Sequence, residues 1–210
     1  MDFPVALKLA LQTLQEYSKL KELQKKNHNR HFQILKDGDQ ILFPFAFHGS
    51  EPINLAVLNK NWKIHVLETD KTFLHQAVKR TEAIDLESRI NFFDHGLEEH
   101  GDKGYAAGFS TLVINLLDDN QRALYLKGMV DRLLPGARLT VLALFNQPGA
   151  LDAWKEEKPE AKKQIEELMQ IAPPLDRQAF ISEMEALGLA ESYSWGTDHL
   201  LESIHFKKGV

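Results

Sequence analysis

The chain has 210 residues, 43% of them hydrophobic and 26% charged, which is the balance of a folded α/β domain rather than of a disordered chain. It contains no cysteine, which excludes disulfides, cysteine-ligated zinc, iron–sulfur clusters and thiol nucleophiles. Its formal net charge of -5 provides no field for recruiting nucleic acid, and no apolar run approaches the ~20 residues of a membrane helix. The N-terminus lacks the basic region and cleavage site of a signal peptide, so we expect a cytoplasmic protein without membrane or nucleic-acid partners.

The first 35 residues have their own pattern. Leucines recur at three- and four-residue steps through residues 4–26, with Lys, Gln and Glu between them, which predicts an amphipathic helix. The polar run Asn27-His28-Asn29 is expected to end this helix. We therefore expect residues 1–35 to form a helical arm or lid, followed by a second unit at 36–210.

From residue 41 onward, apolar strand patterns alternate with helical ones. The predicted strands are 41–47, 63–68, 89–93, 110–115 and 138–145, and the predicted helices between them are 53–58, 71–80 and 119–133. A polar loop is expected at 96–108 and a turn at 134–137. This alternation predicts a doubly wound, mostly parallel sheet with helices on both faces.

The C-terminal third departs from strict alternation. A charged helix at 154–170 is expected within a helical insertion at 147–174, where Pro173-Pro174 breaks the pattern. A further helix at 176–187 is followed by two strands, 189–195 and 199–206, close enough to be antiparallel neighbours. The whole sheet is thus expected to be Rossmann-like and seven-stranded, with an antiparallel last strand.

Polar residues and a glycine stand at the ends of the first four predicted strands. Because ligands of an open parallel sheet bind beyond the carboxyl ends of its strands, these residues are the candidate site: Gly49, Glu68, Asp94 and Asn115. A helix N-terminus after Gly49 offers free N–H groups, and Glu68 can accept both hydroxyls of a ribose. Each residue also has an ordinary reading as a turn or cap residue, but four on one edge favour a binding site.

The order of elements and these strand ends resemble the class I S-adenosylmethionine-dependent methyltransferases over residues 36–206. Residues 41–67 resemble the family's opening strand, turn, helix and strand, and Leu133 to Leu139 resembles its Leu-Lys-Pro-Gly-Gly-Arg-Leu run. The turn at 45–49, Phe-Ala-Phe-His-Gly, is nearer to the thiopurine methyltransferase-like branch than to Gly-x-Gly-x-Gly.

The resemblance implies S-adenosylmethionine as cofactor, an unidentified and small acceptor, and contacts from His48, Gly49, Glu68, Thr69, Asp94, His95 and Asn115. His48 and Gly49 are implied at the methionine end. Glu68 is implied on the ribose with Thr69 beside the adenine, whose amino group is implied to bind Asp94, with His95 adjacent. Asn115 is implied near the sulfonium. No residue is singled out as a catalytic base.

Other functions stay open at this point. A methyltransferase fold kept as a binding or scaffold module is favoured by the phenylalanines of the glycine turn, Phe47 among them. A nicotinamide-dependent oxidoreductase could use Glu68 on ribose, but its Gly-x-Gly-x-x-Gly turn is missing. A metal site around His95 and His100 is not expected, because these histidines are five residues apart rather than four and no third ligand is evident.

Overall fold

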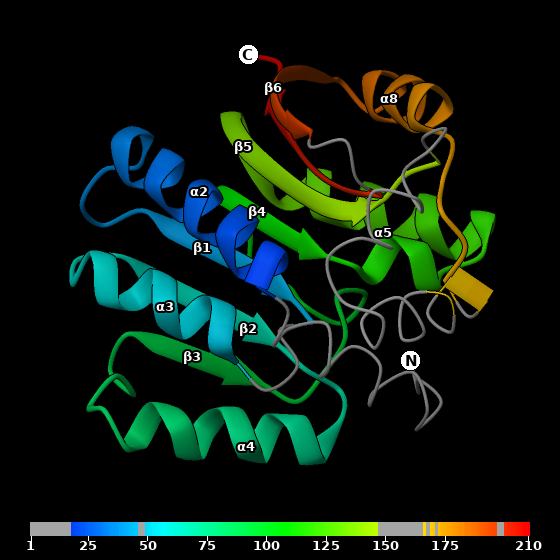
Figure 1. Cartoon of the computed structure of the whole chain (residues 1–210). Helices are drawn as coiled ribbons and strands as arrows, with labels where there is room; N and C mark the ends of the chain where they lie inside the picture. Colours follow the sequence, from blue (N-terminus) through cyan, green and yellow to red (C-terminus); the bar gives the residue numbers. More distant parts are fainter. Residues whose placement is uncertain (1–17, 46–48, 147–165, 167–168, 171, 197–199) are drawn as a thin grey trace.

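The computed structural model describes residues 18–45, 49–146, 166, 169–170, 172–196 and 200–210. At its centre lies a seven-stranded sheet with the order β3-β2-β1-β4-β5-β7-β6 (Figure 1). Strands β1 to β5 pair in parallel, and β7 is antiparallel to both of its neighbours. The predicted fold class, including the antiparallel last strand, is confirmed.

The strands are β1 (Gln40–Pro44), β2 (Lys63–Leu67), β3 (Ile90–Phe93), β4 (Tyr105–Thr111), β5 (Leu133–Leu144), β6 (Leu189–Gly196) and β7 (Leu201–Lys208). The helices are α2 (Ser18–Ile34), α3 (Ser50–Leu58), α4 (Lys71–Glu82), α5 (Asp119–Arg132) and α8 (Arg177–Ala186), with a 3₁₀ turn, η1 (Val113–Leu116).

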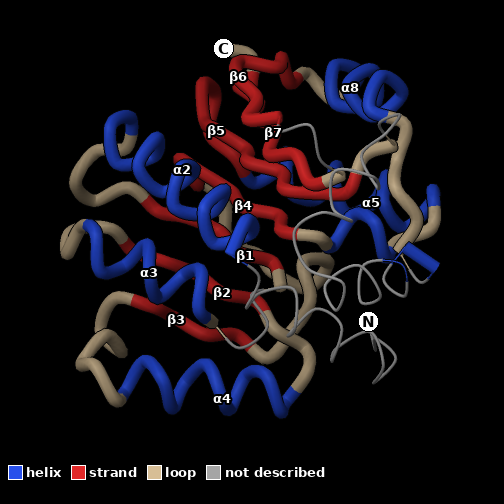
Figure 2. Tube along the Cα trace, in the orientation of Figure 1, coloured by secondary structure: helices blue, strands red, loops and turns tan. Residues whose placement is uncertain are grey.

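Helices lie on both sides of the sheet (Figure 2). Helices α2 and α3 cover one face, with α4 beside α3 along the β3 edge. The apolar residues of this face include Phe43, Ile64 and Phe109. The opposite face packs against α5 and α8 through a larger apolar cluster that includes Met129 and Phe180. The central strands β1, β2, β4 and β5 therefore alternate their side chains between two buried layers, as strands covered on both faces do.

Aspartates mark where three helices begin. The Asp70 carboxylate accepts hydrogen bonds from the N–H groups of Thr72 and Phe73 at the start of α4. Asp118 caps α5 in a reciprocal capping box, and Asp176 caps α8. Such caps satisfy amide groups that have no partner inside the helix, which is why the sequence located these starts well.

The prediction that the N-terminal helix ends at Asn27-His28-Asn29 is wrong, since α2 continues to Ile34. Asn27 and His28 are buried rather than exposed. The Asn27 Oδ1 atom accepts hydrogen bonds from Ser203 Oγ at 2.8 Å and from His205 Nε2 at 2.9 Å, both on β7. These tertiary bonds compensate for the poor helix propensity of the polar run, because packing routinely overrides propensity.

A buried polar network thus joins α2 to the sheet. His31 Nε2 lies 2.6 Å from Thr140 Oγ1 on β5, and that oxygen lies 3.1 Å from His205 Nδ1. His31 is fully buried and His205 only 3% exposed. Residues 18–34, the second half of the predicted arm or lid at 1–35, are therefore packed into the α/β unit. Residues 1–17 of that arm lie outside the described residues.

Two further predictions need correction. The fourth strand is Tyr105–Thr111 rather than 110–115, so it occupies part of the predicted 96–108 loop. Its central residue is Gly108, where an added Cβ would lie 2.9 Å from the Met129 methyl of α5. The close packing of α5 therefore favours a small residue here, and a glycine gives little indication of a strand in the sequence. The predicted turn at 134–137 falls inside β5, where the pairing with β4 shifts in register. Most of the predicted insertion, 147–174, lies outside the described residues.

Candidate functional site

The carboxyl ends of β1, β2 and β3 meet at one edge of the sheet. Pro44 pairs with Leu67, which pairs with Phe93, so the three strands end in register. Beyond them, the Glu68 N–H donates to the Phe93 carbonyl at 3.0 Å. This bond places the acid that follows β2 beside Asp94, the acid that follows β3, as the sequence predicts for a parallel sheet.

Gly49 begins α3 with φ of +80°, a left-handed conformation that favours glycine. A Cβ atom at this position would lie 2.8 Å from the Cβ of Ala77, so α4 packs directly against the turn. His48, predicted beside Gly49, lies outside the described residues, as do Ala46 and Phe47.

Glu68 is 3% exposed, and its Oε1 atom accepts the Asp70 N–H at 2.9 Å. Thr69, between these acids, is half-buried. Asp94 is exposed, and the half-buried His95 donates from Nδ1 to the Gly96 carbonyl at 3.1 Å. One buried and one exposed acid therefore follow neighbouring strands at this edge, and both carboxylates are acceptors suited to hydroxyl or amino donors.

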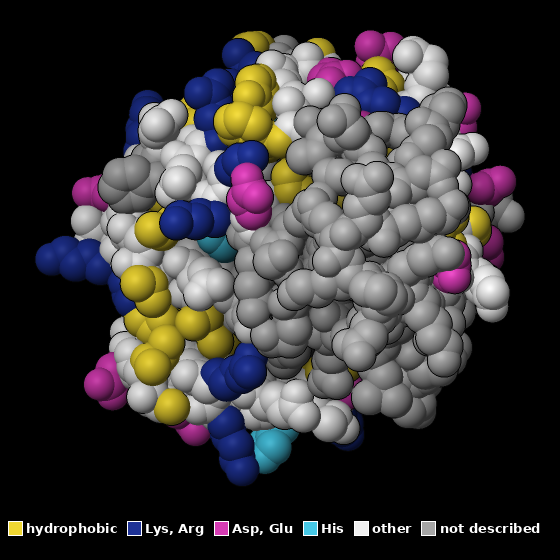
Figure 3. Space-filling view, in the orientation of Figure 1, with side chains coloured by type: hydrophobic (Ala, Val, Ile, Leu, Met, Phe, Trp, Pro, Cys, Tyr) yellow, Lys and Arg dark blue, Asp and Glu magenta, His cyan; other side chains and the backbone are white. Residues whose placement is uncertain are grey.

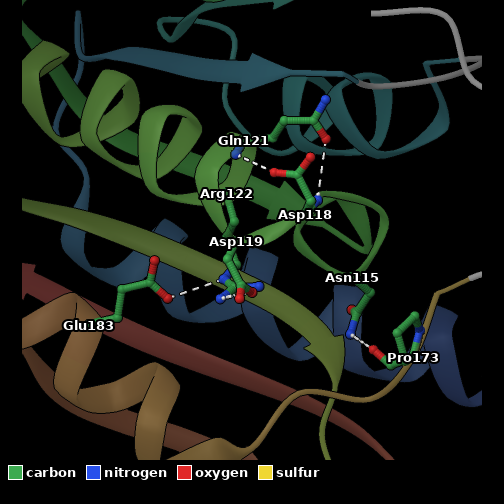
Figure 4. Close-up of polar contacts among 7 residues, drawn as sticks. All are labelled: Asn115, Asp118, Asp119, Gln121, Arg122, Pro173 and Glu183. Atoms are coloured by element: carbon green, nitrogen blue, oxygen red, sulfur yellow. Dashed lines mark hydrogen bonds and ion pairs between the residues drawn. The ribbon is translucent and has the colours of Figure 1, made fainter.

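Asn115 does not end a strand, since β4 stops at Thr111 and Asn115 lies in η1. Its amide nitrogen donates to the Pro173 carbonyl at 3.2 Å (Figure 4) and to the Leu144 carbonyl at 2.9 Å. Its oxygen accepts the Leu144 N–H at 2.9 Å. The side chain thus joins η1 to the end of β5 and to the Pro173 segment. Both polar groups of the Asn115 side chain are thus engaged with β5 and with Pro173.

Phe45 occupies a glycine-like position at the same edge. Its φ is 71°. Positions 45, 47 and 49 have the same spacing as the three glycines of Gly-x-Gly-x-Gly, and Phe45 occupies the first of them. A left-handed conformation costs an L-residue about 1–2 kcal/mol. The Phe45 side chain lines a cavity of about 290 Å³ together with Leu97 and Tyr125, between the 94–104 loop and α5. The site therefore has a hollow beside the strand ends, with an aromatic ring in its wall.

A buried carboxylate that the sequence did not single out lies on the α2 side of this edge. Glu51, in the first turn of α3, accepts a hydrogen bond from the Thr111 hydroxyl at 2.7 Å. Its other oxygen lies 3.7 Å from His28 Nε2, beyond hydrogen-bond distance. Glu51 ties the start of α3 to the end of β4 and to α2. The only hint in the sequence is an acid at the start of an apolar helix.

A larger cavity of about 780 Å³ lies between α2, α3 and α4, away from the aligned strand ends. Lys25, His28 and Arg80 line it together with apolar residues such as Ile53. Figure 3 shows hydrophobic side chains gathered over this side of the molecule, and Val57, Leu58 and Ile84 are among those exposed. The acids of the strand edge do not line this cavity.

A second polar cluster lies on the opposite face of the sheet, under the 94–104 loop. The Tyr105 hydroxyl is 2.8 Å from His65 Nδ1 and 2.6 Å from His100 Nε2. Burial lowers the pKa of both imidazoles, with the nearby Asp102 carboxylate acting against that shift, and burial raises the pKa of Tyr105. A histidine within the apolar strand Ile64–Leu67 is the one signal in the sequence that could have located this cluster.

No helix among the described residues combines the length and the apolar character needed to cross a membrane. No protein-family model matches the sequence, and no relative is found among the curated proteins. Comparison with solved structures does find similar folds.

A possible exported protein from Bordetella parapertussis aligns with a TM-score of 0.71 at 17% identity, over 91% of this chain and 68% of that chain. The mitomycin 7-O-methyltransferase MmcR aligns with a TM-score of 0.67 at 13% identity, over 95% of this chain and 60% of that one. An O-methyltransferase family protein from Burkholderia thailandensis aligns with a TM-score of 0.68 at 12% identity, over 89% of this chain and 56% of that one. The chain thus spans between about half and two thirds of the length of these proteins.

Proposed function

Starting from the fold that this chain shares with the class I S-adenosylmethionine-dependent methyltransferases, we propose that it binds S-adenosylmethionine and transfers the methyl group to a small-molecule acceptor. The observation that carries the proposal is that Glu68 and Asp94 follow the neighbouring strands β2 and β3 at the carboxyl edge of the sheet, where the Glu68 N–H donates to the Phe93 carbonyl. Fold alone does not decide function, so the chemistry of this edge is the argument.

The donor set of the edge suits an adenosyl group. The Glu68 carboxylate is positioned by the Asp70 N–H and is proposed to accept the ribose hydroxyls, with Thr69 beside it. Asp94, exposed on the neighbouring strand end, is proposed to accept the adenine amino group, with His95 next to it. Gly49 allows the backbone close approach at the start of α3, where His48 is proposed to join it. Asn115 is proposed to act through the backbone of β5 rather than through the cofactor itself.

S-adenosylmethionine would supply an electrophilic methyl group on sulfonium sulfur. The residues of this chain would then align an acceptor with that methyl group and exclude water, and holding two reactants in line accounts for much of the rate in such a displacement. No general base follows from the geometry. The N-terminal arm and the 147–174 segment are proposed to cover the acceptor and so to set specificity.

A small acceptor is supported by the mitomycin 7-O-methyltransferase among the similar structures and by the net charge of -5, which does not favour a polyanion.

The test is calorimetry and thermal unfolding with S-adenosylhomocysteine and, as a comparison, NAD. We expect saturable binding of the adenosyl ligand and no response to NAD. Glu68→Ala should weaken binding about 10- to 100-fold, because a hydrogen bond to a charged group contributes about 1.5–3 kcal/mol. Glu82→Ala, an exposed acid at the end of α4, is the matched control and should bind as the unmodified protein does. Equal affinity in the Glu68 variant would contradict the ribose assignment.

The alternative is a methyltransferase fold that serves as a binding module without transferring a methyl group. Phe45 favours it, because a bulky residue stands at a left-handed position in the wall of the edge cavity. No thermal response to S-adenosylhomocysteine, with the chain folded, would support this alternative.

A further inference from the structure

The crossover from β3 to β4 contains no helix, and the loop at 94–104 closes over one face of the sheet instead. Polar residues from three parts of the chain meet beneath this loop. His65 comes from the middle of β2, His100 and Asp102 from the loop, and Tyr105 from the first position of β4. His65, His100 and Tyr105 are buried, and Asp102 is exposed on its outer side.

Their ligand atoms converge on one small volume. One nitrogen each from His65 and His100 and one oxygen from Asp102 all lie within 4.8 Å of one another. The Asp102 Oδ2 atom is 3.7 Å from His65 Nδ1. The Tyr105 oxygen lies between the rings, 2.8 Å from the first and 2.6 Å from the second. One nitrogen each of His65 and His100 and one oxygen each of Asp102 and Tyr105 therefore lie close together beneath the loop.

We propose that His65, His100 and Asp102 bind a zinc ion, with water as the fourth ligand, and that the ion displaces the Tyr105 hydroxyl from its hydrogen bonds to the two ring nitrogens. Tetrahedral zinc with bonds of about 2.0–2.2 Å holds its nitrogen and oxygen ligands about 3.3–3.5 Å apart. The separation of 3.7 Å between His65 and Asp102 is close to that value, and the limit of 4.8 Å requires the set to contract by about an ångström. Two of the three ligands belong to the loop, where Gly101 and Gly104 flank Asp102 and allow that movement.

One contact of His65 must change on ligation. Its second nitrogen, Nε2, lies 3.3 Å from the Asn91 amide nitrogen on β3, which is a donor. Ligation through Nδ1 leaves the proton on Nε2, so the Asn91 amide must turn and present its oxygen to that N–H, because the second nitrogen of a ligating histidine generally donates a hydrogen bond. Arg132 of α5 is the cation that faces the cluster, and its guanidinium is directed to the His100 carbonyl. Asp102 supplies the opposite charge. A bound zinc ion therefore completes a set of donors that the fold already holds together.

Zinc at this position would fasten the 94–104 loop to β2. The same loop begins with Asp94 and His95, so the ion would also fix the distance between this end of the loop and the sheet. The inference does not rest on the proposed function, because zinc binding is measured without any adenosyl ligand.

The experiment uses the untagged full chain, dialysed against EDTA and then titrated with zinc sulfate by calorimetry, with cobalt(II) absorbance as a second measurement. We expect one zinc per chain and a rise in melting temperature on binding. Asp102→Ala and His100→Ala should each raise the zinc Kd at least 10-fold. Asp102 has a side chain that is 58% exposed, so its variant tests the site without disturbing the core.

His95→Ala is the matched control. His95 belongs to the same loop, and its ring centroid lies 5.3 Å from that of His100, but it is not one of the proposed ligands. Its variant should keep the zinc Kd of the unmodified chain. The inference is overturned if zinc up to 1 mM gives no saturable binding, or if Asp102→Ala and His100→Ala bind zinc as tightly as His95→Ala.

Discussion

Acidification is expected to loosen the contact between α2 and the sheet through the histidines buried there. His205 Nε2 donates to Asn27 Oδ1, so a neutral ring has its Nδ1 available to accept from the Thr140 hydroxyl. Thr140 in turn lies next to His31. This arrangement satisfies a neutral imidazole and offers no counter-ion to a protonated one.

The pKa values give the sign of the effect. Burial, followed by the charges of Arg30 and Arg138, lowers the pKa of His205 from 6.5 to about 4. Burial likewise lowers the pKa of His31, with His205 and His28 as the next causes. Above the unfolded pKa, neither state binds the proton and stability is unaffected. As the pH falls below 6.5, His205 and His31 become protonated in the unfolded chain but stay neutral in the folded one. The free energy of unfolding therefore decreases.

The magnitude follows from 1.36 kcal/mol per pKa unit. Between pH 8 and pH 5, His205 alone is expected to lower the free energy of unfolding by about 2 kcal/mol, and His31 adds a loss of the same sign. Urea unfolding at these two pH values, with EDTA present, measures the difference.

The substitution His205→Gln keeps a donor for Asn27 but removes the titrating group. The pH-dependent loss should therefore shrink by about 2 kcal/mol in this variant. His75→Gln, an exposed histidine of α4, is the control and should retain the full loss. If His205→Gln loses as much stability between pH 8 and pH 5 as the unmodified chain, the argument from His205 burial is refuted.

Two substitutions test the strand edge in other ways. Gly49→Ala combines a left-handed φ of +80° with a Cβ contact of 2.8 Å to Ala77. We therefore expect the free energy of unfolding, measured in urea, to decrease by about 1–3 kcal/mol. An unchanged free energy of unfolding would mean that α3 and α4 move apart without cost. Asn115→Leu should lower the melting temperature, because it leaves the buried N–H and carbonyl of Leu144 without their side-chain partner, at about 1–3 kcal/mol for each orphaned group; an unaltered melting temperature would show that the bonds to Leu144 and Pro173 are dispensable.

The sequence by itself determined the alternation of strands and helices and the class of sheet. Apolar runs, helical leucine spacing and turn residues are local signals, and right-handed crossovers convert their order into a topology. The sequence also indicated that Glu68 and Asp94 share an edge of the sheet, because both follow strands and β2 and β3 are parallel neighbours.

Tertiary structure decided whatever depends on partners distant in the chain. Asn27 is helical because its side chain is hydrogen-bonded to His205 of β7, which lies 178 residues away in the chain. Gly108 lies in a strand on which α5 packs closely. His65 and His100 meet at Tyr105 because the loop folds back over the sheet. Local patterns carry no information about such pairs, since each residue alone is as well suited to a turn or a solvated surface. Their roles arise only once burial removes water and leaves a specific side chain as the one remaining partner.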